Sequence, residues 1–331
     1  MINKVAIIHD SFLHIGGAEK VLLKLVDKFP EADIYISLLD KKYTNSIVTK
    51  GIIHTSILSK LPFIERYSSL LKPLVLLYWE TLNLNKYELI ISSSHSFSSK
   101  SVNKSRKAKH ISYIHTPPKY LYNEYNEMNW IKKFPFKQLL FPILYLIRKH
   151  DYYSAQKPDL LVANSEVVKD RIKKYYNRNS IVINPPHNTP SSKYKKLKGK
   201  YFLFFSRLEK QKGAELVIRT FTYYNLPLVV IGTGSEEKFL KSIAGKTISF
   251  RGFVSNKQKE DILSKAISLI YAAKDEDYGL VIPEVISHNV PVLAYNSGAI
   301  KEHLKKTNII NTFYEFNKES LYLAIKSIYY S

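Results

Sequence analysis

The chain alternates short apolar runs with helical patterns, and this alternation constrains its fold more than any other feature. Residues 5–8 are apolar, a Gly16-Gly17 turn follows, and apolar residues then recur at helical spacing as far as Phe29. Further strand-like runs are 32–38, 89–92, 110–115 and 160–165, the last with a helical pattern behind it. Strands that alternate with helices predict a largely parallel sheet covered on both faces.

A proline-rich stretch, residues 184–192, interrupts this series and is typical of a linker. A second alternating series follows, with strand-like runs at 201–205, 228–231, 248–250, 266–271 and 290–295. We therefore predict an α/β fold of two doubly wound, Rossmann-like domains, residues 1–187 and 200–331, joined by a linker over 188–199. Such a pair places a cleft between its domains, and ligands bind at the carboxyl ends of the strands.

The length of 331 residues is enough for two domains, each with its own core. The absence of cysteine excludes a disulfide framework, a thiolate metal site and a thiol nucleophile. The N-terminus runs directly into an apolar segment, so we expect no signal peptide. The longest apolar stretches, such as 139–147, are too short to span a bilayer. We expect a soluble, cytoplasmic protein.

The formal net charge of +22 favours an anionic partner. Residues 1–195 hold 30 of the 50 Lys and Arg residues but only 15 of the 28 acidic ones, so the excess lies mainly in the first half. Lysine-rich codon usage is an alternative explanation. A basic run supports a nucleic-acid-binding alternative, but no helix-turn-helix, zinc finger or RNA-recognition signature accompanies it. The run consists of Lys100, Lys104, Arg106, Lys107 and Lys109.

The segment 130–149 combines aromatic and apolar residues with lysines and arginine at its ends. This composition suits the interface of an anionic membrane, which predicts peripheral contact of the first domain with the inner face of the cell membrane. A buried helix with charged ends is the alternative.

Two glutamates, Glu276 and Glu284, lie eight residues apart around Gly279. Pro283 suits a first helical turn, so Glu284 is expected at a helix start. A carboxylate accepts paired hydrogen bonds from adjacent hydroxyls such as those of a ribose or a hexose. Amides of a glycine turn and of a helix start suit a phosphate. Together these groups suit a sugar nucleotide.

Arg207 and Lys212 follow the strand predicted at 201–205. Two cations there can hold a diphosphate and stabilise the charge that develops as it leaves, whereas solvated surface cations are the alternative. Gly232 and Gly234 follow the next strand and open a helix, where bare backbone can approach a nucleotide. The third glycine of the dinucleotide-binding fingerprint is absent.

The order of these motifs resembles that of the group 1 (family 4) glycosyltransferases of the GT-B type. The chain looks most similar to the bacterial mannosyltransferase-like branch that builds surface polysaccharides. The motifs that carry the resemblance are His9-Asp10-Ser11, Gly16-Gly17-Ala18-Glu19-Lys20, Ser92-Ser93-Ser94-His95, Tyr113-Ile114-His115-Thr116-Pro117, Val162-Ala163-Asn164-Ser165, Ser206-Arg207-Leu208, Gly252-Phe253-Val254 and the Glu276…Glu284 segment.

The resemblance implies a role for residues of both domains. The donor residues that it implies are Glu276 for the hexose, Glu284 for the ribose, Arg207, Lys212 and the amides near Gly279 and Leu280 for the diphosphate, and Gly252 and Phe253 at the nucleobase. The implied residues of the first domain are His115 for the reacting sugar, Gly16 and Gly17 for the diphosphate and acceptor, and His9 and Asp10 for the acceptor. His115 and Glu276 would take part in catalysis.

The chain departs from the group's pattern in three places. Tyr278 stands where relatives commonly have Phe, and residues 272–274 replace a lead-in that usually contains proline. Relatives normally continue past this chain's last residue with a helix that crosses back to the first domain. We therefore expect a short second domain, which leaves domain closure and full activity open.

The resemblance implies a retaining transfer of a hexosyl unit from a nucleoside diphosphate sugar to a saccharide or lipid-linked saccharide. GDP-mannose is the first candidate donor. We find no nucleophile for the sugar's reacting face, so front-face substitution with the leaving phosphate as base is expected. Asp275-Glu276-Asp277 could hold a metal, but fixed cations can replace one, and we expect no metal or other cofactor. A sugar-nucleotide 2-epimerase of the same fold is the main alternative. The sequence does not name the base, acceptor, linkage or oligomeric state.

Overall fold

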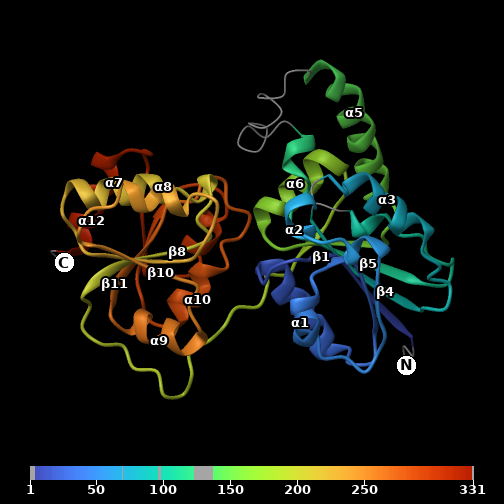
Figure 1. Ribbon diagram of the computed structural model, residues 1–331, viewed down its shortest axis with the longest axis horizontal. Helices are drawn as coiled ribbons and strands as arrows, with labels where there is room; N and C mark the ends of the chain where they lie inside the picture. Colours follow the sequence, from blue (N-terminus) through green and yellow to red (C-terminus); the bar gives the residue numbers. More distant parts are fainter. Residues whose placement is uncertain (1–3, 69, 96–97, 123–136, 330–331) are drawn as a thin grey trace. The chain divides into compact units, whose positions relative to one another are not determined.

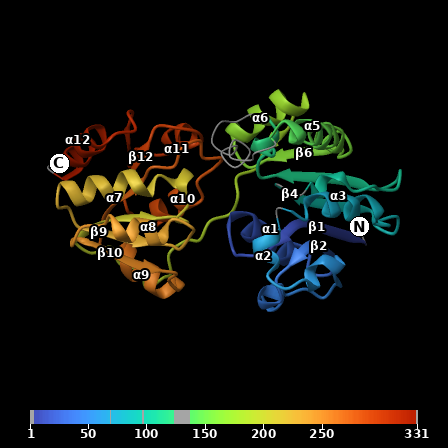
Figure 2. The ribbon, with the colours of Figure 1, turned by 45° about the horizontal axis from the view of Figure 1, so that its top comes forward.

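The computed structural model describes residues 4–68, 70–95, 98–122 and 137–329, and it divides into two compact units, residues 1–186 and 187–331 (Figure 1). Each unit is a parallel sheet with helices on both faces (Figures 1 and 2). The predicted α/β fold with two doubly wound sheets is confirmed. Among the described residues, no helix is both long enough and apolar enough to cross a membrane.

Unit 1 contains a seven-stranded sheet in the order β3-β2-β1-β4-β5-β6-β7, and all paired strands are parallel. The strands are β1 (Val5–Phe12), β2 (Asp33–Leu39), β3 (Ile53–Thr55), β4 (Leu89–Ser94), β5 (Lys109–Ile114), β6 (Leu160–Ala163) and β7 (Ile181–Val182). The strand order reverses between β1 and β4, so the carboxyl ends of these two strands flank the crevice where such sheets bind ligands.

The helices of unit 1 pack against clusters of buried residues on the two faces of the sheet. The α-helices are α1 (Gly17–Lys28), α2 (Ile64–Tyr67), α3 (Lys72–Thr81), α5 (Lys137–Ser154) and α6 (Glu166–Tyr176), and the short 3-10 helices are η1 (Lys41–Ser46), η2 (Ile57–Lys60), η3 (Ser99–Ser101) and η4 (Lys119–Leu121). Successive residues of β1 point to opposite faces, so Ile7 packs with Leu22 of α1, whereas Ile8 packs in the core that contains Val75 and Trp79 of α3.

Unit 2 contains a six-stranded parallel sheet in the order β10-β9-β8-β11-β12-β13, whose order reverses between β8 and β11. The strands are β8 (Tyr201–Phe205), β9 (Leu228–Ile231), β10 (Ile248–Gly252), β11 (Ala266–Tyr271), β12 (Val292–Tyr295) and β13 (Ile310–Phe313). The helices are η5 (Lys210–Lys212), α7 (Ala214–Tyr223), α8 (Glu237–Ser242), α9 (Asn256–Ser264), α10 (Val281–Ser287), α11 (Ile300–Leu304) and α12 (Lys318–Tyr329). The last helix packs on α7, where Leu321 and Ile325 join the core around Phe221.

The segment 188–199 belongs to unit 2 and is hydrogen-bonded to its helices. The hydroxyl of Ser191 donates to the Glu260 carboxylate at 2.8 Å, and the Tyr194 hydroxyl donates to the carbonyl oxygen of His288 at 2.8 Å. These bonds hold the beginning of unit 2 against α9 and the end of α10.

Candidate active site

Glu276 and Lys212 meet at the point where the strand order of unit 2 reverses. Glu276 follows β11 and Lys212 follows β8, and these strands are neighbours in the sheet. Lys212 Nζ lies 2.7 Å from Glu276 Oε2, which also accepts a 2.6 Å hydrogen bond from the Tyr271 hydroxyl. The side chains of Lys212 and Glu276 are only 17% and 14% exposed. Burial, reinforced by the neighbouring carboxylate, raises the pKa of Tyr271 well above its usual value, so the phenol is a fixed donor.

A glycine turn fixes the loop that carries Glu276. Gly298 has a φ of +57°, and a Cβ there would lie 2.4 Å from the carbonyl oxygen of Glu276. That oxygen accepts a hydrogen bond from the Ala299 amide at 2.9 Å, and the Asp275 amide donates to Ser297 Oγ at 2.8 Å. The turn at 297–299 therefore determines where the Glu276 backbone lies.

Glu284 lies in the first turn of α10, directly after Pro283, as predicted from the proline. Its side chain is 1% exposed, and its Oε1 forms an ion pair with Lys259 of α9. The same oxygen accepts a 3.4 Å hydrogen bond from Asn188 Nδ2. The sequence analysis missed Lys259. Its spacing of four residues from the buried Leu263 was the available signal, because it places both side chains on the apolar face of α9.

Arg207 lies just past β8 and is exposed, and no carboxylate among the described residues forms an ion pair with it. Gly232 closes the neighbouring strand with a φ of +125°, and a Cβ there would lie 1.9 Å from the carbonyl oxygen of Ser206. A Cβ on Gly234 would lie 2.4 Å from the carbonyl oxygen of Leu208. Both glycines therefore allow the chain after β9 to pack closely against the loop that carries Arg207.

The remaining residues predicted around the donor lie in two turns of unit 2. Gly252 ends β10 with a φ of +62°, and the Phe253 side chain that follows is 86% exposed. Gly279 has a φ of +77°, and a Cβ there would lie 3.3 Å from the Glu276 side chain. Leu280 is the N-cap of α10. The structure thus brings Gly279 next to Glu276.

In unit 1, a hydroxyl links two of the predicted histidines. Ser93 Oγ lies 3.0 Å from His9 Nδ1 and 2.8 Å from His115 Nε2, which joins the ends of β1, β4 and β5. The ring centroids of His95 and His115 are 6.3 Å apart. Burial lowers the pKa of His115 to about 3. His115 is therefore neutral near pH 7, so it can orient a sugar hydroxyl by hydrogen bonding but cannot serve as a charged acid.

Asp10 is completely buried and holds the loop that follows β4. Its carboxylate accepts hydrogen bonds from the backbone amides of His95 at 2.7 Å and Ser99 at 2.6 Å. His95 Nδ1 lies 3.5 Å from the same carboxylate. Asp10 thus has a structural role in positioning His95, beside the acceptor role that the resemblance implies.

Glu19 is a buried residue of this site to which the sequence analysis assigned no role. Its Oε2 accepts a 2.9 Å hydrogen bond from the Gly16 amide, and its Oε1 lies 3.9 Å from His9 Nε2. Burial would raise the pKa of Glu19, but the hydrogen bond and charge of His9, together with the charges of nearby histidines, outweigh it and lower this pKa to about 2. The spacing of three residues from Gly16, typical of a capping box, was the available signal. Gly17 is the first residue of α1.

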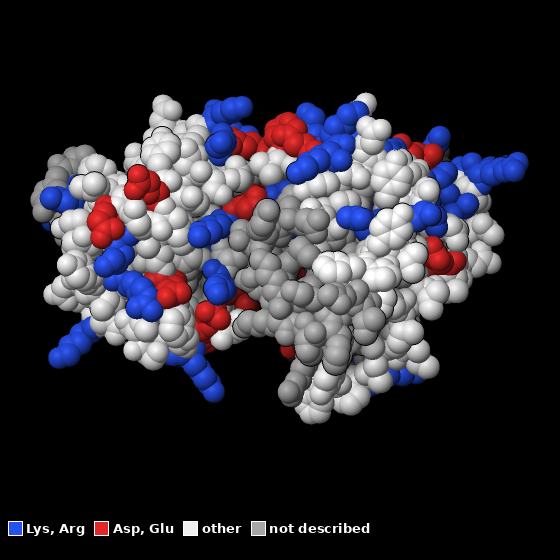
Figure 3. All heavy atoms as spheres, turned by 90° about the horizontal axis from the view of Figure 1, so that it is seen from above, with Lys and Arg blue, Asp and Glu red and all other residues white. Residues whose placement is uncertain are grey.

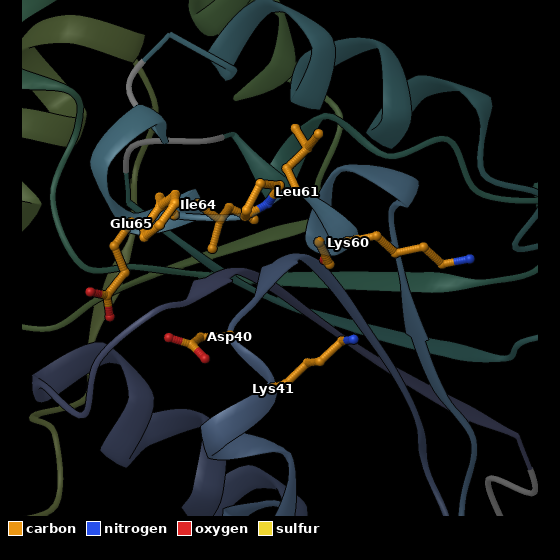
Figure 4. A pocket seen from close by; sticks show the side chains of 9 residues that line it. Asp40, Lys41, Lys60, Leu61, Ile64 and Glu65 are labelled. Carbon is orange, nitrogen blue, oxygen red and sulfur yellow. The ribbon is translucent and has the colours of Figure 1, made fainter.

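Unit 1 also contains a cavity of about 700 Å³ next to the carboxyl end of β2 (Figure 4). Its charged lining includes Asp40 and Glu65, and Lys42 bridges these carboxylates at 2.8 and 2.7 Å. The full lining is Asp40, Lys41, Ser59, Lys60, Leu61, Pro62, Phe63, Ile64 and Glu65. The sequence analysis did not predict this cavity.

Residues 187–329 match the family model described as "Glycosyl transferases group 1". No curated protein sequence matches the chain. Among solved structures, Alr3699/HepE of Anabaena in complex with UDP and glucose has a TM-score of 0.67 at 15% identity, over 97% of this chain and 89% of that one. Sucrose-phosphate synthase of Thermosynechococcus elongatus has a TM-score of 0.68 at 14% identity, over 99% and 90%. A glycosyltransferase of Rickettsia africae has a TM-score of 0.63 at 16% identity, over 99% and 89%.

These similarities establish the GT-B type of fold, with two Rossmann-like units. Residues 187–329 are therefore similar to a group 1 glycosyl transferase domain. Together, the match and the shared fold support a glycosyltransferase enzyme.

Proposed function

We propose that the chain transfers a hexosyl unit from a nucleoside diphosphate sugar to a saccharide or lipid-linked saccharide in surface polysaccharide synthesis, with retention at the anomeric carbon. The observation that carries this proposal is the Glu276 carboxylate, which Lys212 and Tyr271 fix beside the Gly279 turn. A fixed, partly buried carboxylate can recognise neighbouring sugar hydroxyls, and a glycine turn leaves room for a phosphate.

Two donors are the first candidates. The sequence resemblance favours GDP-mannose, and the similarity to a structure that contains UDP and glucose adds UDP-glucose. In either case, the buried Glu284 would hold the ribose hydroxyls. The Lys259 ion pair supports this assignment, because it keeps a carboxylate ionised in a buried place.

The proposed reaction breaks the bond between the anomeric carbon and the diphosphate oxygen, and the electron pair leaves with the diphosphate. The acceptor oxygen forms the new bond on the same face of the sugar, and its proton passes to the leaving phosphate oxygen. Arg207 and Lys212 would stabilise the negative charge that develops on the diphosphate. His115, neutral because it is buried, would orient a hydroxyl of the reacting sugar.

A transfer assay with radiolabelled sugar nucleotides tests this proposal. Glu276→Ala and Arg207→Ala should abolish transfer while the circular dichroism spectrum stays native. Arg219→Ala is a matched control, because Arg219 is an exposed arginine that pairs with Glu215 on α7. Full activity in both site variants would overturn the assignment. A thermal-shift screen against nucleoside diphosphates and their sugars would identify the donor, since a ligand that binds only the folded state raises the melting temperature.

The main competing function is a sugar-nucleotide 2-epimerase. Incubation with the donor alone separates the two, because an epimerase converts the donor without an acceptor. Nucleic-acid binding, suggested only by the charge, predicts retention of oligonucleotides that weakens steeply with salt.

We also propose that unit 1 acts at the anionic inner face of the cell membrane, where a lipid-linked acceptor would be found. Of the segment predicted to contact the membrane, residues 130–136 lie outside the described residues. Residues 139–147 belong to α5, where Phe141, Tyr145 and Leu146 are 53%, 55% and 63% exposed.

A further inference from the structure

Helix α3 exposes apolar side chains on the side that faces away from the core. Val75 and Trp79 are fully buried beneath it. The helical period places positions 74 and 77 on the opposite side. Leu70, just before the helix, Leu74 and Leu77 are 77%, 50% and 60% exposed. A surface helix normally exposes polar residues on this side.

Helix α6 of the same unit shows the normal pattern. It buries Val168 and Ile172 and exposes Asp170, Lys173 and Lys174. The exposed leucines of α3 are therefore not a pattern that every helix of the unit shares. Contiguous exposed apolar side chains on a water-soluble surface indicate an interaction site.

The α2 helix and α5 extend this apolar surface. Phe63, the N-cap of α2, is 80% exposed. We call Phe63, Leu70, Leu74 and Leu77 the apolar ridge. Helix α5, which also exposes apolar side chains, is joined to the end of α3, because His150 Nε2 lies 2.9 Å from the Glu80 carboxylate.

Three exposed lysines without a carboxylate partner in the described part of the chain lie on elements next to α2 and α3 in the chain or joined to them by contacts. Lys41 and Lys60 line the cavity with Phe63, and Figure 4 shows both extending in the same direction. Together with Lys149 of α5, they are exposed and have no carboxylate partner among the described residues. In the view of Figure 3, Lys and Arg side chains are spread more widely over the surface than Asp and Glu.

The acidic side chains closest to the apolar ridge in sequence each pair with a cation, and Glu65 shares Lys42 with Asp40. Glu65 pairs with Lys42 at 2.7 Å, and Glu80 pairs with His150 at 2.9 Å and lies 3.7 Å from Lys157. Among the charged residues named here, the lysines (Lys41, Lys42, Lys60, Lys149 and Lys157) outnumber the carboxylates (Asp40, Glu65 and Glu80) by five to three, which leaves a net positive charge.

We infer that the apolar ridge inserts into an anionic lipid bilayer, with Lys41, Lys60 and Lys149 at the level of the lipid phosphates. Exposed leucine and phenylalanine side chains enter the boundary between head groups and acyl chains, and lysines at their margin attract anionic lipid. The inference specifies the surface for the proposed membrane-bound acceptor. It concerns residues 63–77, which lie outside the segment that the sequence predicted.

The absence of cysteine makes a single-site probe simple to install. Leu74→Cys and Leu323→Cys would each carry an NBD fluorophore, since Leu323 is a similarly exposed leucine in unit 2. Vesicles of phosphatidylcholine with 30% phosphatidylglycerol should increase the fluorescence at position 74 several-fold and leave position 323 unchanged. Pure phosphatidylcholine should have little effect. Equal responses at both positions, or none at 74, would overturn the inference.

Cosedimentation with the same vesicles provides a second readout. Leu70→Ser/Leu74→Ser/Leu77→Ser should weaken binding at least about tenfold, and Lys60→Gln should weaken it about fivefold at low salt. The control Tyr223→Ser/Tyr314→Ser/Leu323→Ser changes exposed apolar residues of unit 2 and should bind like the wild type. Undiminished vesicle binding by the ridge variant would contradict the inference. A wild-type protein that binds no vesicles but forms a dimer, which the ridge variant does not form, would also contradict it. Neither experiment uses a donor, so failure here leaves the transferase proposal standing, and failure of transfer leaves this inference standing.

Discussion

Lys212 Nζ and Glu276 Oε2 lie 2.7 Å apart, although 64 residues separate them in the chain. The pair connects the loops after β8 and β11, the two strands at which the order of the second sheet reverses. A cation that we assign to the diphosphate and a carboxylate that we assign to the sugar are therefore one electrostatic unit. The diphosphate of a donor that binds both residues must therefore compete with the Glu276 carboxylate for the Lys212 ammonium group.

We predict that Lys212→Met and Glu276→Gln are not additive in stability. The double variant should lose less free energy of unfolding than the two single losses combined, by between about 0.5 and 3 kcal/mol, because both side chains are largely buried. Urea denaturation of the four proteins measures this coupling. The exposed pair Lys241 and Glu237, also 2.7 Å apart, is the control and should give about 0.3–0.5 kcal/mol. Equal coupling in both pairs would contradict the prediction.

Removal of Lys259 should destabilise unit 2 by about 3–5 kcal/mol, because Lys259→Met leaves the Glu284 carboxylate buried without its counter-ion. Adding Glu284→Gln should restore part of that stability. The double variant should nevertheless show no thermal shift with a nucleoside diphosphate, if Glu284 holds the ribose. A normal shift in the folded double variant would refute the ribose assignment.

The alternation of strands and helices allowed both sheets to be predicted, because periodicity reports which side chains a parallel sheet buries. It missed β3, β7 and β13, which have three, two and four residues and lie at sheet edges. β3 and β7 have too few residues for a periodic signal. β13 is as long as the predicted β9, but its two central residues, Asn311 and Thr312, are polar. The cavity beside β2 was missed because its lining depends on how residues 59–65 fold back on Asp40.

For the candidate site, the motifs named the residues that are expected to contact the substrate but not those that hold them. Lys259 acts through a contact between α9 and α10, and a charge in a helical segment normally predicts a solvated side chain. Tyr271 and Glu19 bond to Glu276 and Gly16, five and three residues away, but their burial depends on the packing around them. The helical spacing of Lys259 from Leu263 places it on the apolar face of α9 but does not name its partner. Only the packing of α9 on α10 shows that Lys259 reaches Glu284.

Gly298→Ala should impair both stability and transfer, since the new Cβ would lie 2.4 Å from the Glu276 carbonyl oxygen and the residue has a positive φ. Gly252→Ala is a matched control for stability, because Gly252 has a similar φ and only the Thr233 methyl, 4.0 Å away, near the new Cβ. Gly252→Ala should lower the free energy of unfolding by about 1–2 kcal/mol, which is the cost of a positive φ in a residue with a Cβ. Gly298→Ala should exceed that value in urea denaturation. A smaller loss than that of Gly252→Ala would show that the turn at 297–299 does not constrain Glu276.

Transfer should continue in excess EDTA, because Arg207 and Lys212 can supply the positive charge that a metal ion provides in other transferases. The assay compares initial rates with EDTA, with Mg²⁺ and with Mn²⁺. Rates within about twofold of one another agree with the prediction. If EDTA abolished transfer and Mn²⁺ restored it, the prediction would be wrong, and Asp275 and Asp277 would be the candidate metal ligands.

Stability should fall as the pH decreases from about 6.5, because two histidines are neutral in the folded state. Burial lowers the pKa of both His110 and His115 to about 3, whereas an unfolded histidine binds a proton near pH 6.5. Between these values the unfolded state binds more protons, so the free energy of unfolding rises with pH, by up to about 1.4 kcal/mol per pH unit for each histidine. Glu19, with a pKa near 2 instead of 4.5, contributes stability that is lost only below about pH 4.5.

Urea denaturation between pH 5.5 and 8 therefore isolates the contribution of the histidines to the free energy of unfolding. His110→Asn should reduce the slope below pH 6.5 relative to wild type, and the two curves should run parallel above pH 7.5. An unchanged slope would show that His110 is not the neutral, buried group that its contact with Ser92 indicates.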